Sequence, residues 1–501
     1  MKKLVAIVAV MCCFTGITFS QCIVASSMES AVAGIPDTQS QALGLANFQT
    51  ENSFNIFFNP AQVTEWQTVY GEVWGGAANT WGGANTKLFF GNIGVFVGRP
   101  YTGNAGGFGA NADLAVAVYG LNQGVAGPGN GAVTGNNAIT GVVDNLTPLG
   151  IANNNIDIFY GKALSDDLSL GARLSLANNS NNLTWNYTAS AAATSAGDGT
   201  VSLKRQSSDT QLGAGVLFKE MGPFQKLDVA LTIAMPSVNN SYALSCIQTA
   251  ATTNKLTESD ELKSNNAANI SLLGRGLSEL NGNKLYTTVG YSMVDVSAKR
   301  TAVADNDATV AGNDVNKEVT YNDKTTGILL DAAYHTEPAK DIKAIYTVGI
   351  RTSSRVDEVA ESDLVLGQAA ATLTGPLKWE KLEVTNMSIP LSVAVEYQAW
   401  SKVCTRLGVQ KNFMSSTQTK ATNQGYVVST NANLRDTVVA VTGYDNTLDP
   451  TAQAANVTLG LGITPSKDFE IDLALVSTIF DLDSGAGVSD LISRASIRYH
   501  F

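Results

Sequence analysis

The stretch LSLGARLSL, residues Leu168–Leu176, decides the fold class of this chain. Its leucine and alanine residues occupy every second position, and serine, glycine and arginine stand between them. Because successive side chains of a β-strand point to opposite sides, this strand separates an apolar from a polar medium. The same alternation returns at Leu391–Ala399 and Phe469–Leu475, with charges only on the polar side. The pattern predicts an all-β chain that forms an antiparallel, up-and-down transmembrane β-barrel.

The last residues, ASIRYHF, carry this alternation to the end of the sequence, with Ile497, Tyr499 and Phe501 on one face. If this strand pairs with the first one, those three side chains face lipid. The ending resembles that of bacterial outer-membrane proteins, in which a terminal strand closing on Phe is read by the barrel-assembly machinery. A secreted, soluble β-sandwich or solenoid is the alternative interpretation.

The composition excludes several classes of function. The 501 residues carry a net charge of -11 without a basic cluster, which argues against nucleic acid as a partner. His335 and His500 are the only two histidines, and neither has a neighbour at metal-ligand spacing. We therefore expect no metal, no cofactor and no enzymatic activity.

The N-terminus predicts export. Lys2 and Lys3 precede an apolar stretch and then small residues, the pattern of a signal peptide ending at residue 26, or alternatively at residue 33. We expect residues 34–63 to form an N-terminal segment and residues 64–501 the barrel. Export leaves Cys246 and Cys404 as the mature cysteines, and their pairing stays open.

Alternating segments predict fourteen to sixteen strands, with sixteen as the best count. Short turns such as Ser165–Asp167 alternate with long polar stretches such as 179–206 and 236–266, which we expect to be loops. The predicted strands are Thr64–Trp74, Thr86–Val97, Ala110–Leu121, Asn154–Lys162, Leu168–Ala177, Ser207–Phe218, Lys226–Met235, Ala267–Gly276, Lys284–Val296, Tyr321–Tyr334, Ile342–Thr352, Glu383–Ala399, Val403–Phe413, Ala455–Ile463, Phe469–Phe480 and Asp490–Phe501.

Asn59-Pro60-Ala61-Gln62, preceded by Phe57 and Phe58, predicts a short helical turn. Asn caps it, Pro takes the first helical position, and Gln reaches back to the cap. The motif resembles the Asn-Pro-Ala motif of the long-chain fatty-acid and hydrocarbon channels of the outer membrane and of the related PorV group. That resemblance implies an N-terminal plug in the lumen and a path for hydrophobic molecules through the wall.

Charged residues on the polar faces of the predicted strands should point into the lumen, where they select solutes or pair and fill space. They are Arg173, Asp228, Asp331, Lys343, Arg351, Glu396, Arg406, Glu470 and Asp472. Acidic long loops either keep the outer surface solvated or bind divalent cations that bridge lipopolysaccharide. We expect outer-membrane lipid and lipopolysaccharide as partners.

We expect an integral protein of the bacterial outer membrane that transports hydrophobic or amphipathic small solutes passively. Two alternatives remain open. One is a water-filled diffusion porin, and the other is a PorV-like barrel that docks secreted proteins without transporting solutes.

Overall fold

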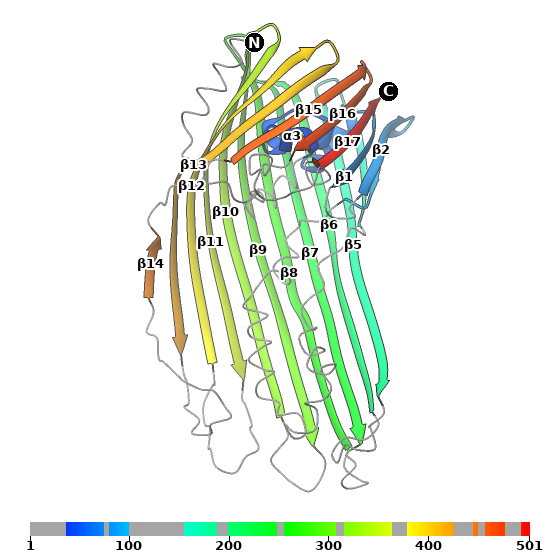
Figure 1. Cartoon of the computed structure of the whole chain (residues 1–501), viewed down its shortest axis with the longest axis vertical. Coiled ribbons are helices and arrows are strands. Elements are labelled where there is room, and N and C mark those ends of the chain that lie inside the picture. Colours follow the sequence, from blue (N-terminus) through cyan, green and yellow to red (C-terminus); the bar gives the residue numbers. More distant parts are fainter. Residues whose placement is uncertain are drawn as a thin grey trace, which may run out of the picture.

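The computed structural model describes residues 37–74, 80–99, 155–187, 199–247, 255–306, 315–362, 378–424, 444–448, 456–475 and 492–501. The predicted signal peptide and the predicted strand Ala110–Leu121 lie outside these residues. The described residues form one antiparallel sheet of seventeen strands (Figure 1).

The strands are β1 (Thr68–Trp74), β2 (Thr80–Leu88), β3 (Gly91–Val97), β4 (Asn155–Ala163), β5 (Leu168–Tyr187), β6 (Gly199–Met221), β7 (Phe224–Ile247), β8 (Lys255–Leu280), β9 (Asn283–Asn306), β10 (Val315–Ala339), β11 (Ile342–Ser362), β12 (Lys378–Trp400), β13 (Val403–Gln424), β14 (Tyr444–Leu448), β15 (Asn456–Ser466), β16 (Phe469–Leu475) and β17 (Ile492–His500). Among the described residues, four short helices precede them: α3 (Thr38–Ala42), η1 (Asn47–Gln49), η2 (Ser53–Phe57) and η3 (Pro60–Thr64). Among the residues described, no helix has the length and apolar character needed to cross a bilayer.

The sheet closes on itself. β1 pairs with β17 in a register that places Val69 opposite Tyr499 and Gly71 opposite Ile497. β13 pairs with β15 near the short turns, and farther along it pairs with β14. Sixteen strands therefore complete the ring and β14 is an addition to it, which confirms the predicted barrel and excludes the sandwich.

The strand count agrees with the prediction, but one strand differs. The predicted strand Thr86–Val97 is divided into the end of β2 and all of β3 by a turn at Phe89-Phe90. The apolar run Leu88–Phe90 hides this turn in the sequence, because three apolar residues are typical of a strand, whereas Phe89 is 99% exposed at the turn. β3 then pairs directly with β4.

Several predicted loops are instead strand. β5 to β13 run well beyond the predicted boundaries, and polar stretches such as Asn178–Asn182 opposite Lys204–Ser208 continue the backbone ladder. Figure 1 shows these strands extending far past β1–β4 and β15–β17. Polar strands can pair in this way where both faces meet water, since only lipid demands an apolar side. Alternating hydrophobicity therefore marks the lipid-facing part of a strand and misses the rest.

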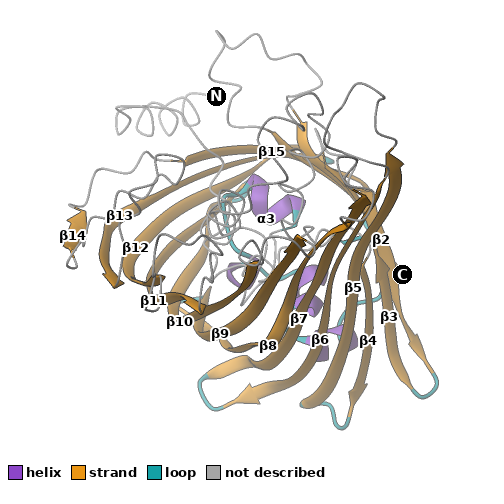
Figure 2. Ribbon diagram, turned by 90° about the horizontal axis from the view of Figure 1, so that it is seen from below, coloured by secondary structure: helices purple, strands orange, loops and turns teal. Residues whose placement is uncertain are grey.

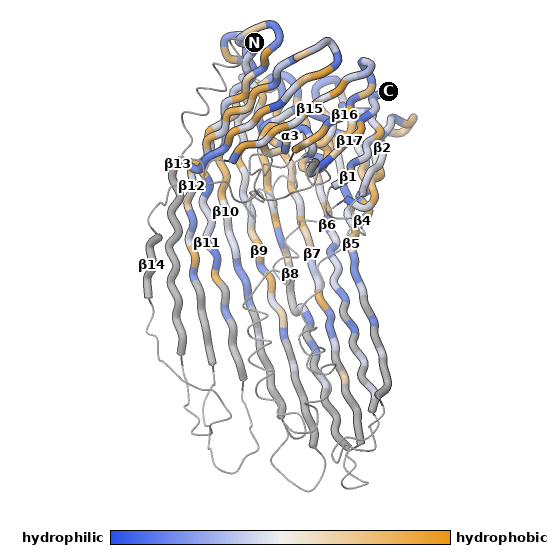
Figure 3. Tube along the Cα trace, viewed as in Figure 1, coloured by the Kyte–Doolittle hydropathy of each residue, from blue (hydrophilic) through white to orange (hydrophobic). Residues whose placement is uncertain are grey.

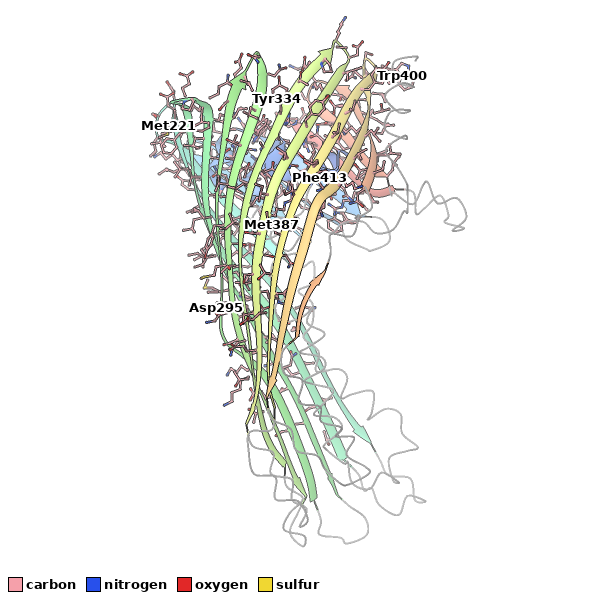
Figure 4. The ribbon with its side chains drawn as sticks, turned by 90° about the vertical axis from the view of Figure 1, so that its left-hand side faces the viewer. Met221, Asp295, Tyr334, Met387, Trp400 and Phe413 are labelled. Atoms are coloured by element: carbon pink, nitrogen blue, oxygen red, sulfur yellow. The ribbon has the colours of Figure 1, made fainter. Side chains whose placement is uncertain are left out.

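An apolar belt surrounds the ring at the end of the barrel that carries the short turns (Figure 3). Val289, Tyr346 and Ile497 are about half exposed on the outer face, while their strand neighbours Thr288, Thr347 and Ser496 are buried. Trp400, near the short turns, and Phe413, farther along β13, are strongly exposed (Figure 4). This outer surface fits a membrane-spanning barrel with interfacial aromatic residues.

A charge in the belt should weaken the barrel in lipid. Val289→Arg, in the lipid-facing part of β9, should lower the free energy of unfolding by about 2–4 kcal/mol, because arginine faces hydrocarbon there. Urea unfolding of protein refolded into liposomes measures this, with Ser165→Arg in an exposed turn as the control. Equal urea midpoints for the two variants would contradict the assignment of this face to lipid.

Candidate functional site

Residues Asp37–Thr64, here called the N-terminal segment, lie within the ring (Figure 2). η3 contacts β3 to β6, whereas α3 contacts β13 and β15 to β17 on another side. Most of the segment is buried, including Asp37, Phe48, Asn55 and Asn59. The segment is thus packed against inward faces from widely separated strands.

The turn around Asn59 has the predicted cap. The Asn59 side chain accepts a hydrogen bond from the Ala61 amide at 3.0 Å, and Pro60 occupies the first helical position. Gln62 does not reach back, which corrects that part of the prediction. Instead, Gln62 Nε2 donates to Asp228 Oδ1 at 2.6 Å, and Asn59 Nδ2 donates to the same oxygen at 2.7 Å. Gln62 thus pairs with a wall carboxylate instead of with the Asn59 amide, which donates to the Asn55 carbonyl at 2.9 Å.

Glycines form a seat for this turn. Gly161, Gly171 and Gly215 stand opposite one another on β4, β5 and β6. A Cβ atom added at any of them would come well under 3.0 Å from atoms of Val63, Pro60-Ala61 or Asn59, respectively. The absence of side chains therefore lets the segment's backbone approach the wall.

A second glycine seat lies on β13 and β15. Added Cβ atoms at Gly408 and Gly460 would collide with Leu43 and Ala42. The segment thus fits into shallow seats near both of its ends.

Asp228 and Arg275 form the first polar anchor. Arg275 Nη2 lies 2.7 Å from Asp228 Oδ2, and both side chains are almost fully buried. Arg275 also donates to the Thr50 carbonyl at 2.9 Å, and its guanidinium lies 4.6 Å from the centre of the Phe58 ring. A buried charge needs such pairing, so the segment supplies part of what keeps Arg275 satisfied.

Arg173 forms the second anchor. It pairs with Asp157 at 2.7 Å and donates to the Phe57 carbonyl at 3.1 Å. Arg99 also pairs with Asp157, and its guanidinium lies 4.7 Å from the Phe57 ring centre.

Two further anchors involve other strands. Arg498 Nη2 on β17 lies 3.0 Å from Asp37 Oδ2, while the same carboxylate caps α3 through the Ser40 amide at 2.8 Å. On β10, Asp331 accepts two hydrogen bonds from Gln49 Nε2 at 2.9 and 3.0 Å. Polar contacts therefore hold the segment from β5, β7, β8, β10 and β17.

The other predicted lumen charges interact mainly with one another. Arg406 is surrounded by Glu396, Glu470 and Asp472, all within salt-bridge distance. Lys343 lies 3.8 Å from Glu396 and remains largely exposed. The remaining member of the set, Arg351, is buried on β11. The geometry therefore brings four of these charges together and places Arg173, Asp228 and Asp331 against the segment.

Aromatic side chains make the apolar part of the site. Phe54 and Phe57 pack against Tyr70, Trp81, Phe96 and Phe159, one from each of β1 to β4. The Phe57 ring centre lies 5.1 Å from that of Phe96 and 5.3 Å from that of Phe159, both edge to face. We call the four wall residues the aromatic patch.

Sequence reasoning missed several of these residues. Arg498 stands between the predicted lipid-facing residues Tyr499 and Ile497, so the same alternation would have placed it inside. Arg275 lies in a predicted strand of weak alternation. Asp37 and Gln49 had no strand pattern to mark them, since they lie in the segment itself.

Among the described side chains there is neither a disulfide nor a group of metal ligands. Cys404 is a free, buried thiol near the short turn that precedes β13, whereas Cys246 lies near the opposite end of β7. Within the described ranges, no group of histidine, cysteine and acidic residues could hold a metal ion.

Filling the first glycine seat should displace the segment. Gly171→Leu would place a side chain where the backbone of Pro60 and Ala61 lies, so the segment should become sensitive to protease. Gly274→Leu is the matched control, because nothing lies within 4 Å of its Cβ position. Limited proteolysis of both refolded proteins measures the effect, and equal resistance would contradict the seat.

Glu51 should hold its contacts over a wide pH range. Burial raises its pKa, but Lys226, which binds it at 2.5 Å, and Lys284 outweigh this and bring the pKa from 4.5 to about 2. A lowered pKa adds stability that is complete above about pH 4.5 and is lost as pH falls through 2. The difference in melting temperature between wild type and Glu51→Gln should therefore be constant from pH 5 to 8 and shrink below pH 4.5. A constant difference down to pH 2 would contradict the ion pair.

Comparison with known proteins yields remote similarities. No protein-family model matches the sequence, and no curated protein matches it. Among solved structures, the toluene transporter TodX of Pseudomonas putida is 12% identical, with 94% of this chain and 95% of that chain covered and a TM-score of 0.30. The copper transporter OprC is 7% identical over 87% and 80% of the two chains, with a TM-score of 0.26. The ferric yersiniabactin uptake receptor FyuA from Yersinia pestis is 8% identical over the same shares, also at 0.26. We assign no family on scores of this size.

Proposed function

We propose that this chain is a passive channel of the bacterial outer membrane for hydrophobic or amphipathic solutes, and that the N-terminal segment is its gate. The observation that carries the proposal is the packing of residues 37–64 inside the ring, against strands on several sides. A closed barrel with an apolar belt suits an outer membrane, because lipid tolerates only spans whose backbone groups are all paired.

The polar character of the anchors supports a segment that can move. Arg173 and Arg275 each bind a carboxylate of the wall and a backbone carbonyl of the segment. Arg498 binds one carboxylate of the segment and one of the wall, so all three side chains lie among polar groups rather than in an apolar core. Buried ion pairs contribute little net stability, because the cost of desolvation offsets most of the Coulomb attraction. The pairs of Arg173 with Asp157 and of Arg275 with Asp228 lie within the wall, so they persist when the segment leaves its seats. Arg498 loses Asp37 but keeps Glu470, and hydration of the freed groups would compensate for part of this loss.

The aromatic patch supports apolar solutes. Phe54 and Phe57 cover Tyr70, Trp81, Phe96 and Phe159, so displacement of the segment would expose an aromatic wall along β1 to β4. Solute sites of this kind are mainly apolar, with few polar groups.

The alternatives have weaker support. An open diffusion porin would need its inward charges free to act on solutes, but Arg173 and Asp228 bind the segment, and Arg406 binds neighbouring acids. The docking barrel stays a prediction, because no described contact bears on a protein partner.

A reversible tether tests the gate. For Asn59→Cys/Gly215→Cys, the Asn59 Cγ position, which a cysteine sulfur would take, lies 3.0 Å from the Cβ position at residue 215. Disulfide bond lengths place a sulfur about 3 Å from the Cβ atom across the bridge, so the pair suits a disulfide. The oxidised protein should be nearly silent in a planar bilayer and should block uptake of an apolar solute by liposomes, and reduction should restore uptake.

Three proteins complete this test. Wild type treated with the same oxidant controls for Cys246 and Cys404, and the single variant Asn59→Cys controls for the lost amide. A variant without residues 34–63 should conduct in large steps. Steady conductance by wild type that neither tether nor deletion changes would refute the gate and favour the porin.

A further inference from the structure

A group of buried polar side chains on the inward faces of β4, β5, β6 and β8 has unmet hydrogen-bonding capacity. Both amide atoms of Asn155 and Asn269, the hydroxyls of Ser175 and Ser207, and Asp209 Oδ1 have no hydrogen-bond partner among the described residues. All five side chains are more than nine-tenths buried. We call these five residues the polar ledge.

The strand registers bring the polar ledge together. Asn155, Ala177 and Asp209 stand opposite one another on β4, β5 and β6. Two residues along the strands toward the short turns, Ser175 on β5 stands opposite Gln211 on β6. Ala234 on β7 stands opposite both Gln211 and Asn269, which lies on β8. Ala177 and Ala234 contribute only a methyl group between the polar groups. The ledge therefore adjoins the N-terminal segment on the side away from the short turns.

Unmet polar atoms of this number need an explanation. Folded proteins leave few buried polar groups without a partner, and those that remain mark strain, a functional role, or a site for water or an ion. Asn155, Asn269 and the serines can both donate and accept, whereas the Asp209 carboxylate can only accept. Asp209 carries the one charge of the ledge and has no ion-pair partner among the described residues.

We propose that the polar ledge binds the head group of an amphipathic solute, and that this head group is a hydrogen-bond donor without negative charge, above all a primary amine. The proposal rests on the proposed channel function and names its solute class. A carboxylate head would face the like charge of Asp209, whereas an ammonium would pair with it.

A chain of hydrogen bonds joins the ledge to the gate. Gln211 Nε2 donates to Asp209 Oδ2 at 2.9 Å, and Arg173 donates to Gln211 Oε1 at 3.3 Å. Arg173 in turn donates to the Phe57 carbonyl at 3.1 Å. A head group that takes over Asp209 competes with Gln211 and so acts on the residue that holds Phe57. The site therefore couples the arrival of a solute to the contact that anchors the segment.

Equilibrium dialysis tests the ledge on the full mature protein in nanodiscs of zwitterionic lipid, with radiolabelled dodecylamine, dodecanol and dodecanoate and with empty nanodiscs subtracted. Dodecylamine should bind most tightly and dodecanoate least. Asp209→Asn should lower the affinity for dodecylamine on the order of tenfold, because a charged hydrogen bond is lost, and should leave dodecanol unchanged.

Asp295→Asn is the matched control. Asp295 stands opposite Ala268, next to Asn269 in the register, but its side chain is exposed on the outer side of β9 (Figure 4). This variant should bind all three probes as wild type does. Ala177→Leu, which places a larger side chain between Asn155 and Asp209 in the register, provides a second variant and should weaken binding of both dodecylamine and dodecanol.

Three results would overturn the proposal: equal binding of dodecanoate and dodecylamine, no effect of Asp209→Asn on dodecylamine, or no effect of Ala177→Leu. Water would then fill the ledge. The reversible tether separates this failure from failure of the channel, because it reports on movement of the segment whichever solute is bound.

Discussion

The antiparallel pairing of β1 with β17 is the constraint on which the rest of the molecule depends. A strand edge in lipid would leave backbone N–H and C=O groups without partners, and each would cost several kcal/mol. Closure removes both edges and gives the wall an outer face, where Tyr499 meets lipid, and an inner face, where Arg498 is buried. Every inward charge must then find its partner inside the ring.

The N-terminal segment supplies many of those partners. Asp228 accepts hydrogen bonds from Asn59 and Gln62 as well as from Arg275, and Asp37 pairs with Arg498. The segment and the inward faces of the wall are thus joined by many buried polar contacts. Polar anchors, glycine seats and aromatic contacts all hold one short stretch of chain. Weakening one kind of contact would therefore weaken the others.

Much of the wall could be predicted from alternation alone. Leu168–Leu176 gave the inward position of Arg173, and the same rule placed Asp228 and Asp472 inside. It failed at Phe89-Phe90, where an apolar turn looks like strand, and along Asn178–Asn182, where every residue is polar. The signal arises because lipid requires an apolar face on a strand. The turn is apolar without being a lipid-facing strand, and the polar stretch has no apolar face.

By itself, the sequence determined the fold class, the closing strand and the inward faces, because lipid on one side and polar contacts on the other impose a period of two on every membrane strand. The capped turn at Asn59 was also local, since its atoms lie within two residues. Only the tertiary structure decided what the inward groups bind. Asn59 meets Asp228 and Gly215, and Asp37 meets Arg498, across separations in sequence that no periodic pattern links. Those contacts exist because closure of the ring brings distant strands around the same short segment.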